Sequence, residues 1–174
     1  EISMYVILKQ EFLTLVDNLD LAFVIRDIKK VAFSKGYGDA VTLLALELIK
    51  SYDISSRGDF LDAALNIFEW LQQMEDGNLI HKINELQIIK RQRAYTKDEK
   101  AFLIRQKTLN IGNNRILCAI NILLENKAES ESNFGQLTNE EREEFIQYPI
   151  FALAKQLNIL KNDHSTDALL SQIL

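Results

Sequence analysis

The N-terminal part of the chain carries apolar residues at the spacing of an α-helix. Across residues 4–33 they recur every three or four positions, for example at Leu8, Phe12 and Leu15. A strand would instead alternate apolar and polar residues. Asn18 or Asp20 divides the segment, because both residue types cap helices and are poor in helix interiors. We therefore predict two helices between residues 4 and 33.

Short turns separate the next two predicted helices. Two glycines within 34–39 give a turn, and Asp39 is the expected N-cap of a helix over 40–52 that is apolar on most faces. Asp59 is the expected cap of the following helix. That helix should end at 76–78, because Gly77 can adopt the left-handed conformation that closes helices. Its apolar stripe comprises Leu61, Ala64, Leu65, Phe68 and Leu71.

The middle of the chain repeats this arrangement. A helix is predicted over 79–95, with the repeated pattern running through Ile80, Ile83, Leu86, Ile89 and Arg93. Thr96 and Glu99 then have the spacing of a capping box, in which each side chain bonds to the other residue's backbone N–H. The helix that follows carries Phe102, Leu103 and Leu109.

The last part of the chain adds further helices. After a Gly112–Asn113 turn, a helix is predicted over 114–127, followed by a polar connection over 128–138. A second capping box, Thr138 with Glu141, starts a helix over 139–148, and Pro149 stands where a helix stops or begins. The remaining predicted helices cover 150–160 and a short stretch from Ser165 or Thr166. The pattern predicts an all-α fold of about ten helices with short connections.

Composition agrees with an all-α fold. The 174 residues include only 6 Gly and 1 Pro, and 47% are hydrophobic against 26% charged. All-β chains need more turn residues, and a chain of this length fits a single domain with a sizeable core. Because the sequence begins with Glu1 rather than Met, we also expect it to be part of a larger protein.

The single cysteine and the hydropathy pattern indicate the compartment. Cys118 excludes an intramolecular disulfide, and its place in the apolar run 116–124 predicts a buried small side chain rather than a reactive thiol. No run of roughly 18 uncharged apolar residues, as a membrane span requires, occurs in the chain. We therefore expect a soluble, cytoplasmic protein.

The glycines suggest a repeat. Gly38, Gly77 and Gly112 are 39 and 35 residues apart, and each opens a predicted helical hairpin. Two-helix units with a period near 34 residues are typical of tetratricopeptide arrays. The chain resembles this family in the small-then-aromatic pair Ala64 and Phe68. Further matching positions are Asp76, close to the usual Pro, the bulky Ile83 and Leu86 of the next unit, and the small Ala101.

The resemblance is degenerate. Gln87 stands where the family prefers a small residue, Lys90 where it prefers Tyr, and Arg105 where it prefers an aromatic residue. It covers residues 39–110 and extends over 113–137 only by analogy. It implies a right-handed α-solenoid with an N-terminal helical pair over 1–35, TPR-like hairpins over 39–137 and capping helices over 138–174. The alternative is a non-repeating α-helical domain.

No pattern in the chain indicates catalysis. It contains no phosphate-binding loop, dinucleotide-binding glycine pattern, nucleophile elbow or metal-ligand spacing. His81 and His164 are far apart in sequence, and a solvent-facing or hydrogen-bonded structural role is expected for His81. The glutamates of 140–144 suit the first turn of a helix, where acidic residues interact favourably with the helix dipole. We expect neither an enzyme nor a bound metal, and the resemblance implies no cofactor.

Charge is unevenly distributed. Residues 81–107 contain eight basic residues against three acidic ones, whereas residues 125–147 contain seven acidic residues against two basic ones. The basic segment could contact phosphates, with Tyr95 as a stacking residue. The net charge of −5 argues against a dedicated nucleic-acid binder. The two segments could instead pair head to tail between copies, giving a homo-oligomer, or contact another domain of the parent protein.

These observations lead to a binding function. Resemblance to tetratricopeptide proteins implies protein partners, so we expect an interaction scaffold or regulatory module of a larger bacterial protein, binding a peptide or a neighbouring domain. The alternative is a nucleic-acid-contacting accessory domain of a bacterial nuclease or NTPase system. The candidate partner-binding residues, which would hold acidic groups, are Lys90, Arg93, Lys97 and Arg105.

Overall fold

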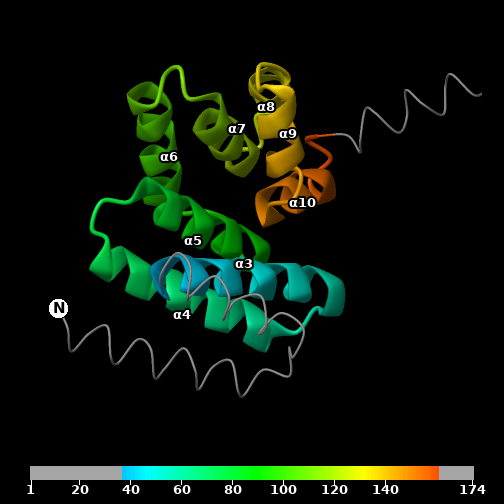
Figure 1. The fold of residues 1–174 in the computed structure, drawn as a ribbon. Helices are drawn as coiled ribbons and strands as arrows, with labels where there is room; N and C mark the ends of the chain where they lie inside the picture. Colours follow the sequence, from blue (N-terminus) through cyan, green and yellow to red (C-terminus); the bar gives the residue numbers. More distant parts are fainter. Residues whose placement is uncertain (1–36, 161–174) are drawn as a thin grey trace, which may run out of the picture. The chain divides into compact units, whose positions relative to one another are not determined.

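A computed structural model describes residues 37–160 of the chain, and these residues form eight α-helices and no strand (Figure 1). The predicted all-α class is therefore confirmed. The helices predicted within 4–33 and 161–174 lie outside the described residues. The chain divides into two compact units, one ending at His81 and the other beginning at Lys82.

In the first unit, helices α3 (Tyr37–Ser55) and α4 (Gly58–Met74) pack against each other (Figure 1). Four of the five residues of the predicted α4 stripe are buried, including Ala64, Phe68 and Leu71 with no exposed surface, whereas Leu65 is only partly buried. It meets an apolar face of α3. The buried residues of that face are Val41, Leu44, Ala45, Leu48 and Ile49.

Both predicted aspartate caps in this unit are wrong. Helix α3 begins at Tyr37, so Asp39 lies in its first turn, and the cap of α4 is Arg57 rather than Asp59. Each aspartate occupies a first turn, where its charge still interacts favourably with the helix dipole. Asp59 also forms an exposed ion pair with Arg57 at 2.6 Å.

The predicted end of α4 is confirmed. The helix ends at Met74, and Gly77 in the following turn has a φ of +80°. Helix α5 (Leu79–Gln92) then begins, and the unit boundary falls within it. Ile83, Leu86 and Ile89 are buried as predicted, but Ile80 is 55% exposed. The buried stripe therefore starts one turn later than the sequence pattern suggests.

Local capping sets the starts of α6 and α7 in the second unit. Helix α6 (Lys97–Leu109) begins with the predicted capping box, in which Glu99 N–H donates to Thr96 Oγ1 at 3.2 Å and Thr96 N–H donates to Glu99 Oε1 at 2.9 Å. Helix α7 (Asn114–Leu123) follows Gly112, which has a φ of +91°, and is capped by Asn113. Residues 118–123 of α7 are all buried.

Helix α8 (Lys127–Gly135) corrects the prediction of a polar connection over 128–138. The segment lacks an apolar stripe, but it packs on α7 through polar side chains. Asn121 Nδ2 donates to Asn133 Oδ1 at 2.8 Å, and Ser130 is fully buried. Tertiary hydrogen bonds therefore hold a helix that hydrophobic periodicity does not predict.

Two short helices complete the described chain. The second predicted capping box is present at the start of α9 (Asn139–Phe145), and Pro149 begins α10 (Pro149–Gln156). An aromatic cluster joins α8, α9 and α10. Phe134 lies 6.0 Å from Phe145 and 5.8 Å from Phe151 between ring centroids.

A hydrogen bond joins α5 to the start of α10. Arg91 Nη2 donates to Pro149 O at 3.0 Å.

Candidate functional site

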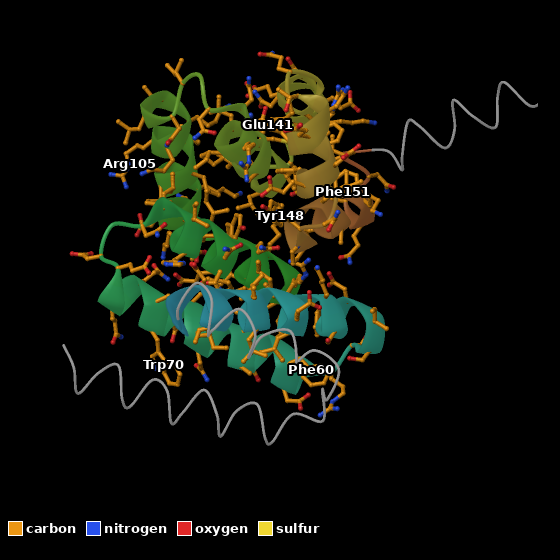
Figure 2. The ribbon with its side chains drawn as sticks, in the orientation of Figure 1. Phe60, Trp70, Arg105, Glu141, Tyr148 and Phe151 are labelled. Carbon is orange, nitrogen blue, oxygen red and sulfur yellow. The ribbon has the colours of Figure 1, made fainter. Side chains whose placement is uncertain are left out.

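Among the longer helices of the second unit, α6 has the fewest buried residues. Of its thirteen residues, Leu103 alone is buried. Figure 2 shows Arg105 projecting from α6 on the side away from α7. We define the α6 outer face by its exposed residues at helical spacing, namely Lys97, Lys100, Ala101, Ile104, Arg105 and Thr108.

Large apolar side chains are exposed on and beside this face. Ile104 is 57% exposed, and Leu109 and Ile111, at the end of α6 and in the turn that follows, are 73% and 81% exposed. Three large apolar side chains are thus exposed within eight positions, beside the basic residues of α6, and such concentrations of exposed apolar side chains often mark binding sites. Ile111 also lines an open concavity of about 530 Å³. The other lining residues are Gly112, Asn113, Asn114, Gln136, Leu137 and Glu141.

The structure brings together two of the four predicted partner-binding residues. Lys97 and Arg105 both lie on the α6 outer face, two turns apart, and Lys100 lies between them. Among the described residues, none of the three has an ion-pair partner. Their charges are therefore available to an external ligand.

Lys90 is committed to an ion pair within the fold. Lys90 Nζ lies 3.0 Å from Glu125 Oε2 and 4.8 Å from the centroid of the Tyr95 ring, and the side chain is only 14% exposed. Lys90 lies on α5, and neither of the residues that it contacts belongs to the α6 outer face. Binding an acidic partner through Lys90 would require breaking this pair.

Arg93 is likewise engaged. Its guanidinium donates two hydrogen bonds to the Glu99 carboxylate, at 2.7 and 2.9 Å. These bonds are the main reason that the pKa of Glu99 falls to about 2. Because Glu99 is also the reaching residue of the α6 capping box, Arg93 helps to fix the start of the helix that presents the outer face.

Tyr95 cannot serve as the stacking residue that the sequence suggested. Its side chain is buried, and its hydroxyl donates to Leu86 O at 2.5 Å. Burial raises the pKa of this hydroxyl well above its usual value. A base could stack on the ring only after local unfolding, so this part of the nucleic-acid interpretation is wrong.

The basic and acidic segments partly neutralise each other inside the second unit. Besides the Lys90 pair, Lys107 Nζ lies 2.5 Å from Glu129 Oε2. A further residue of the acidic segment, Glu144, pairs with Arg115, which follows the basic segment, at 3.2 Å. Three exposed glutamates within the described part of the acidic segment form no ion pair. They are Glu131, Glu140 and Glu143.

The remaining candidate side chains are structural. His81 is 5% exposed, and its Nε2 lies 2.9 Å from Glu75 Oε2, so its expected hydrogen-bonded role is confirmed and the solvent-facing alternative is wrong. Hydrogen bonds from His81 and then Asn78 lower the pKa of Glu75. Cys118 is buried as predicted, and burial raises the pKa of its thiol to about 12. His164 lies outside the described residues.

Sequence reasoning missed the apolar part of this surface. The sequence pattern places Leu109 on this helix beside Phe102 and Leu103 but does not identify Ile104, Leu109 or Ile111 as exposed. The sequence does show that Leu103 and Ile104 lie on different faces of the helix, since successive residues of a helix point about 100° apart. The spacing does not show which of these two faces, that of Leu103 or that of Ile104, is buried.

No protein-family model, curated protein or solved structure matches this chain. Within residues 37–160, no helix is both long enough and apolar enough to cross a membrane, and no three His, Cys, Asp or Glu side chains gather in a way that could hold a metal ion. Function must therefore be argued from the surface itself.

Proposed function

We propose that this chain is a protein-interaction module that binds a peptide or a neighbouring domain through the α6 outer face. The observation that carries the proposal is the exposed Ile104 among three basic side chains without ion-pair partners, Lys97, Lys100 and Arg105. An apolar centre with a charged rim is the usual composition of a protein-binding surface. The favoured partner presents an apolar side chain flanked by carboxylates.

A tetratricopeptide-like arrangement of the hairpins is part of this proposal. Full burial of Ala64 and Phe68 is what the small-then-aromatic pair of that family requires. Ala101, by contrast, is exposed, so the small residue assigned to the following hairpin has no close helix against it among the described residues. The resemblance therefore has better support in α4 than in α6.

The surface chemistry favours a protein over a nucleic acid. Four of the eight basic residues of the basic segment form ion pairs within the unit, namely Lys82, Lys90, Arg93 and Lys107, and Tyr95 is buried, which removes half of the candidate phosphate contacts and the stacking platform. Phosphate binding alone would not explain the exposure of Ile104, Leu109 and Ile111.

Site-specific crosslinking in lysate of the source cells tests the proposal. A photo-crosslinking amino acid is placed at position 104, and a control is placed at Lys127, an exposed position of α8. We expect a protein adduct at 104 that survives nuclease, is absent at 127 and is lost in the Arg105→Glu variant. The identified partner, once purified, should bind that variant at least about tenfold more weakly by calorimetry, because a rim charge is reversed.

Two outcomes would overturn the proposal. Equal adducts at positions 104 and 127 would show that the α6 outer face has no selectivity. Recovery of nucleic acid at 104, with protein adducts disappearing on nuclease treatment, would favour the nucleic-acid-contacting alternative instead. We choose Arg105 and not Lys90 or Arg93 for substitution, because the latter two hold ion pairs of the fold.

A further inference from the structure

A second exposed face in the same unit carries the opposite charge. On α9, Glu140 and Glu143 are exposed and form no ion pair, and Ile146, the C-terminal cap of this helix, is 44% exposed. The three residues follow one another at intervals of three, which places them on one side of the helix. We call these residues the α9 acidic face.

The two faces match in order and in length. Along α6 the sequence of groups is Lys97, Lys100 and then Ile104, and along α9 it is two carboxylates and then Ile146. At a rise of about 1.5 Å per residue, the α6 set spans about 10 Å and the α9 set about 9 Å. Two parallel helices could therefore pair both lysines with glutamates and bring the two isoleucines together.

The two faces do not meet within one chain. Helix α7 packs on both α6 and α8, and Figure 1 draws α6 and α9 on opposite sides of α7. Pairing of α6 with α9 therefore needs two molecules. Each molecule has one face of each kind.

We propose that the α6 outer face of one copy binds the α9 acidic face of a second copy, head to tail. This inference rests on the proposed function and names the partner as another copy of the chain. The interface is heterologous, because different surfaces meet, and repetition of it produces a ring or an open chain of molecules. A contact between two single helices is small, so we expect the association to be weak.

Sedimentation equilibrium with two complementary variants tests the pairing. The first carries Lys100→Glu and Ile104→Gln on the α6 outer face, and the second carries Glu143→Lys and Ile146→Gln on the α9 acidic face. The weight-average mass of the wild-type chain should rise above the 20.0 kDa monomer with concentration, and each variant alone should remain monomeric. An equimolar mixture of the variants should form dimers and nothing larger, because one intact face of each kind remains and the two altered faces, although opposite in charge, have both lost their isoleucine.

Controls separate this outcome from unfolding. Each variant should keep the circular dichroism spectrum and melting temperature of the wild type, since the substituted side chains are exposed. A chain that carries Lys100→Glu and Glu143→Lys together should associate again, because the charges are exchanged across the interface. Glu131→Lys, at an exposed glutamate of α8, is the matched control and should associate normally. Salt of about 0.5 M should weaken association by screening the charges.

The results distinguish this inference from the proposed function. A wild-type chain that stays monomeric at 1 mM protein overturns the head-to-tail pairing. So does association that persists in both single-face variants. If the chain is monomeric but position 104 crosslinks to a different protein, the proposed function stands without this inference. If no adduct forms either, both are wrong.

Discussion

Lys90 Nζ lies 3.0 Å from the Oε2 atom of Glu125, a residue 35 positions further along the chain. Lys107 and Glu129, separated by 22 positions, are joined in the same way at 2.5 Å. These pairs connect the basic segment with the acidic segment inside one unit. Part of the charge that the sequence seems to offer to a partner is therefore used to hold the fold, and the free charge is concentrated on the α6 outer face and the α9 acidic face.

The first prediction concerns the coupling between Lys90 and Glu125. In a double-mutant cycle of Lys90→Met with Glu125→Gln, we expect a coupling energy of about 0.5–1 kcal/mol, because the lysine is largely removed from water. Urea unfolding at low salt measures it. The cycle of Lys97→Met with Glu125→Gln is the control and should show almost no coupling. Equal coupling in both cycles would contradict the specific ion pair.

A second prediction follows from the lowered pKa of Glu99. Its pKa is about 2 in the folded chain, against an ordinary value of 4.5. The ionised carboxylate therefore stabilises the fold above about pH 4.5, and this contribution is lost as the pH falls toward 2. Glu99→Gln retains a capping-box acceptor but removes the charge. It should lower the free energy of unfolding by about 1 kcal/mol at pH 7, since Arg93 is partly solvated.

Urea unfolding of the wild type and of Glu99→Gln at a series of pH values between 7 and about 3 measures this effect. The difference between wild type and Glu99→Gln should stay nearly constant from pH 7 to about pH 5 and shrink as the pH is lowered further to about 3. Glu131→Gln, which removes an unpaired carboxylate, should show no comparable change. A difference for Glu99→Gln that is independent of pH would show that the charge of Glu99 is not what stabilises the fold.

The parts of the fold that sequence predicts are those set by neighbouring residues. Both capping boxes, Thr96 with Glu99 and Thr138 with Glu141, start helices as expected, because all four hydrogen bonds of the two motifs join residues three positions apart. The left-handed turn at Gly77 is also local. The aspartate caps fail because an acidic residue suits a first turn as well as a cap, so the start of the helix is ambiguous by a few residues.

The parts that sequence could not predict depend on distant contacts. Helix α8 is held by the Asn121–Asn133 bond and by burial of Ser130, neither of which produces an apolar pattern. The candidate site is affected in the same way. Residue type alone makes Lys90 and Arg105 equivalent, and only the position of Glu125 in space shows that the first is paired and the second is free.

A third prediction concerns the polar contact between α7 and α8. Asn121 is 2% exposed, donates to Asn133 and accepts a hydrogen bond from Asn126 Nδ2 at 3.1 Å. Asn121→Leu should destabilise the chain by about 1–3 kcal/mol, although leucine suits an apolar helix, because two amide side chains lose their partner. Chemical unfolding measures the loss. Thr108→Ala, at an exposed position of α6, should be close to neutral, and a neutral Asn121→Leu would contradict the network.

The fourth prediction concerns the left-handed residue that ends α10. Asn158 has a φ of 56°, and the next residue, Ile159, donates its N–H to Ala154 O at 2.8 Å, which closes the helix. Glycine adopts this conformation without a Cβ clash, and alanine does not. Asn158→Gly should leave the melting temperature unchanged or raise it slightly, whereas Asn158→Ala should cost about 1 kcal/mol. Equal stability of the two variants would contradict the left-handed geometry.

The last prediction uses Cys118 as a reporter of the α7–α8 packing. Its thiol is fully buried and donates to Ser130 O at 3.6 Å, and its pKa of about 12 keeps it protonated near neutral pH. A thiol reagent at pH 8 should therefore react only when α7 and α8 separate, so the rate reports the free energy of that opening. If Asn121 holds the two helices, Asn121→Leu should accelerate the reaction about tenfold for each 1.4 kcal/mol of stability that it removes. Fast modification of the wild-type chain would contradict the burial of Cys118, and an unchanged rate in the variant would show that the asparagine bond does not control the opening.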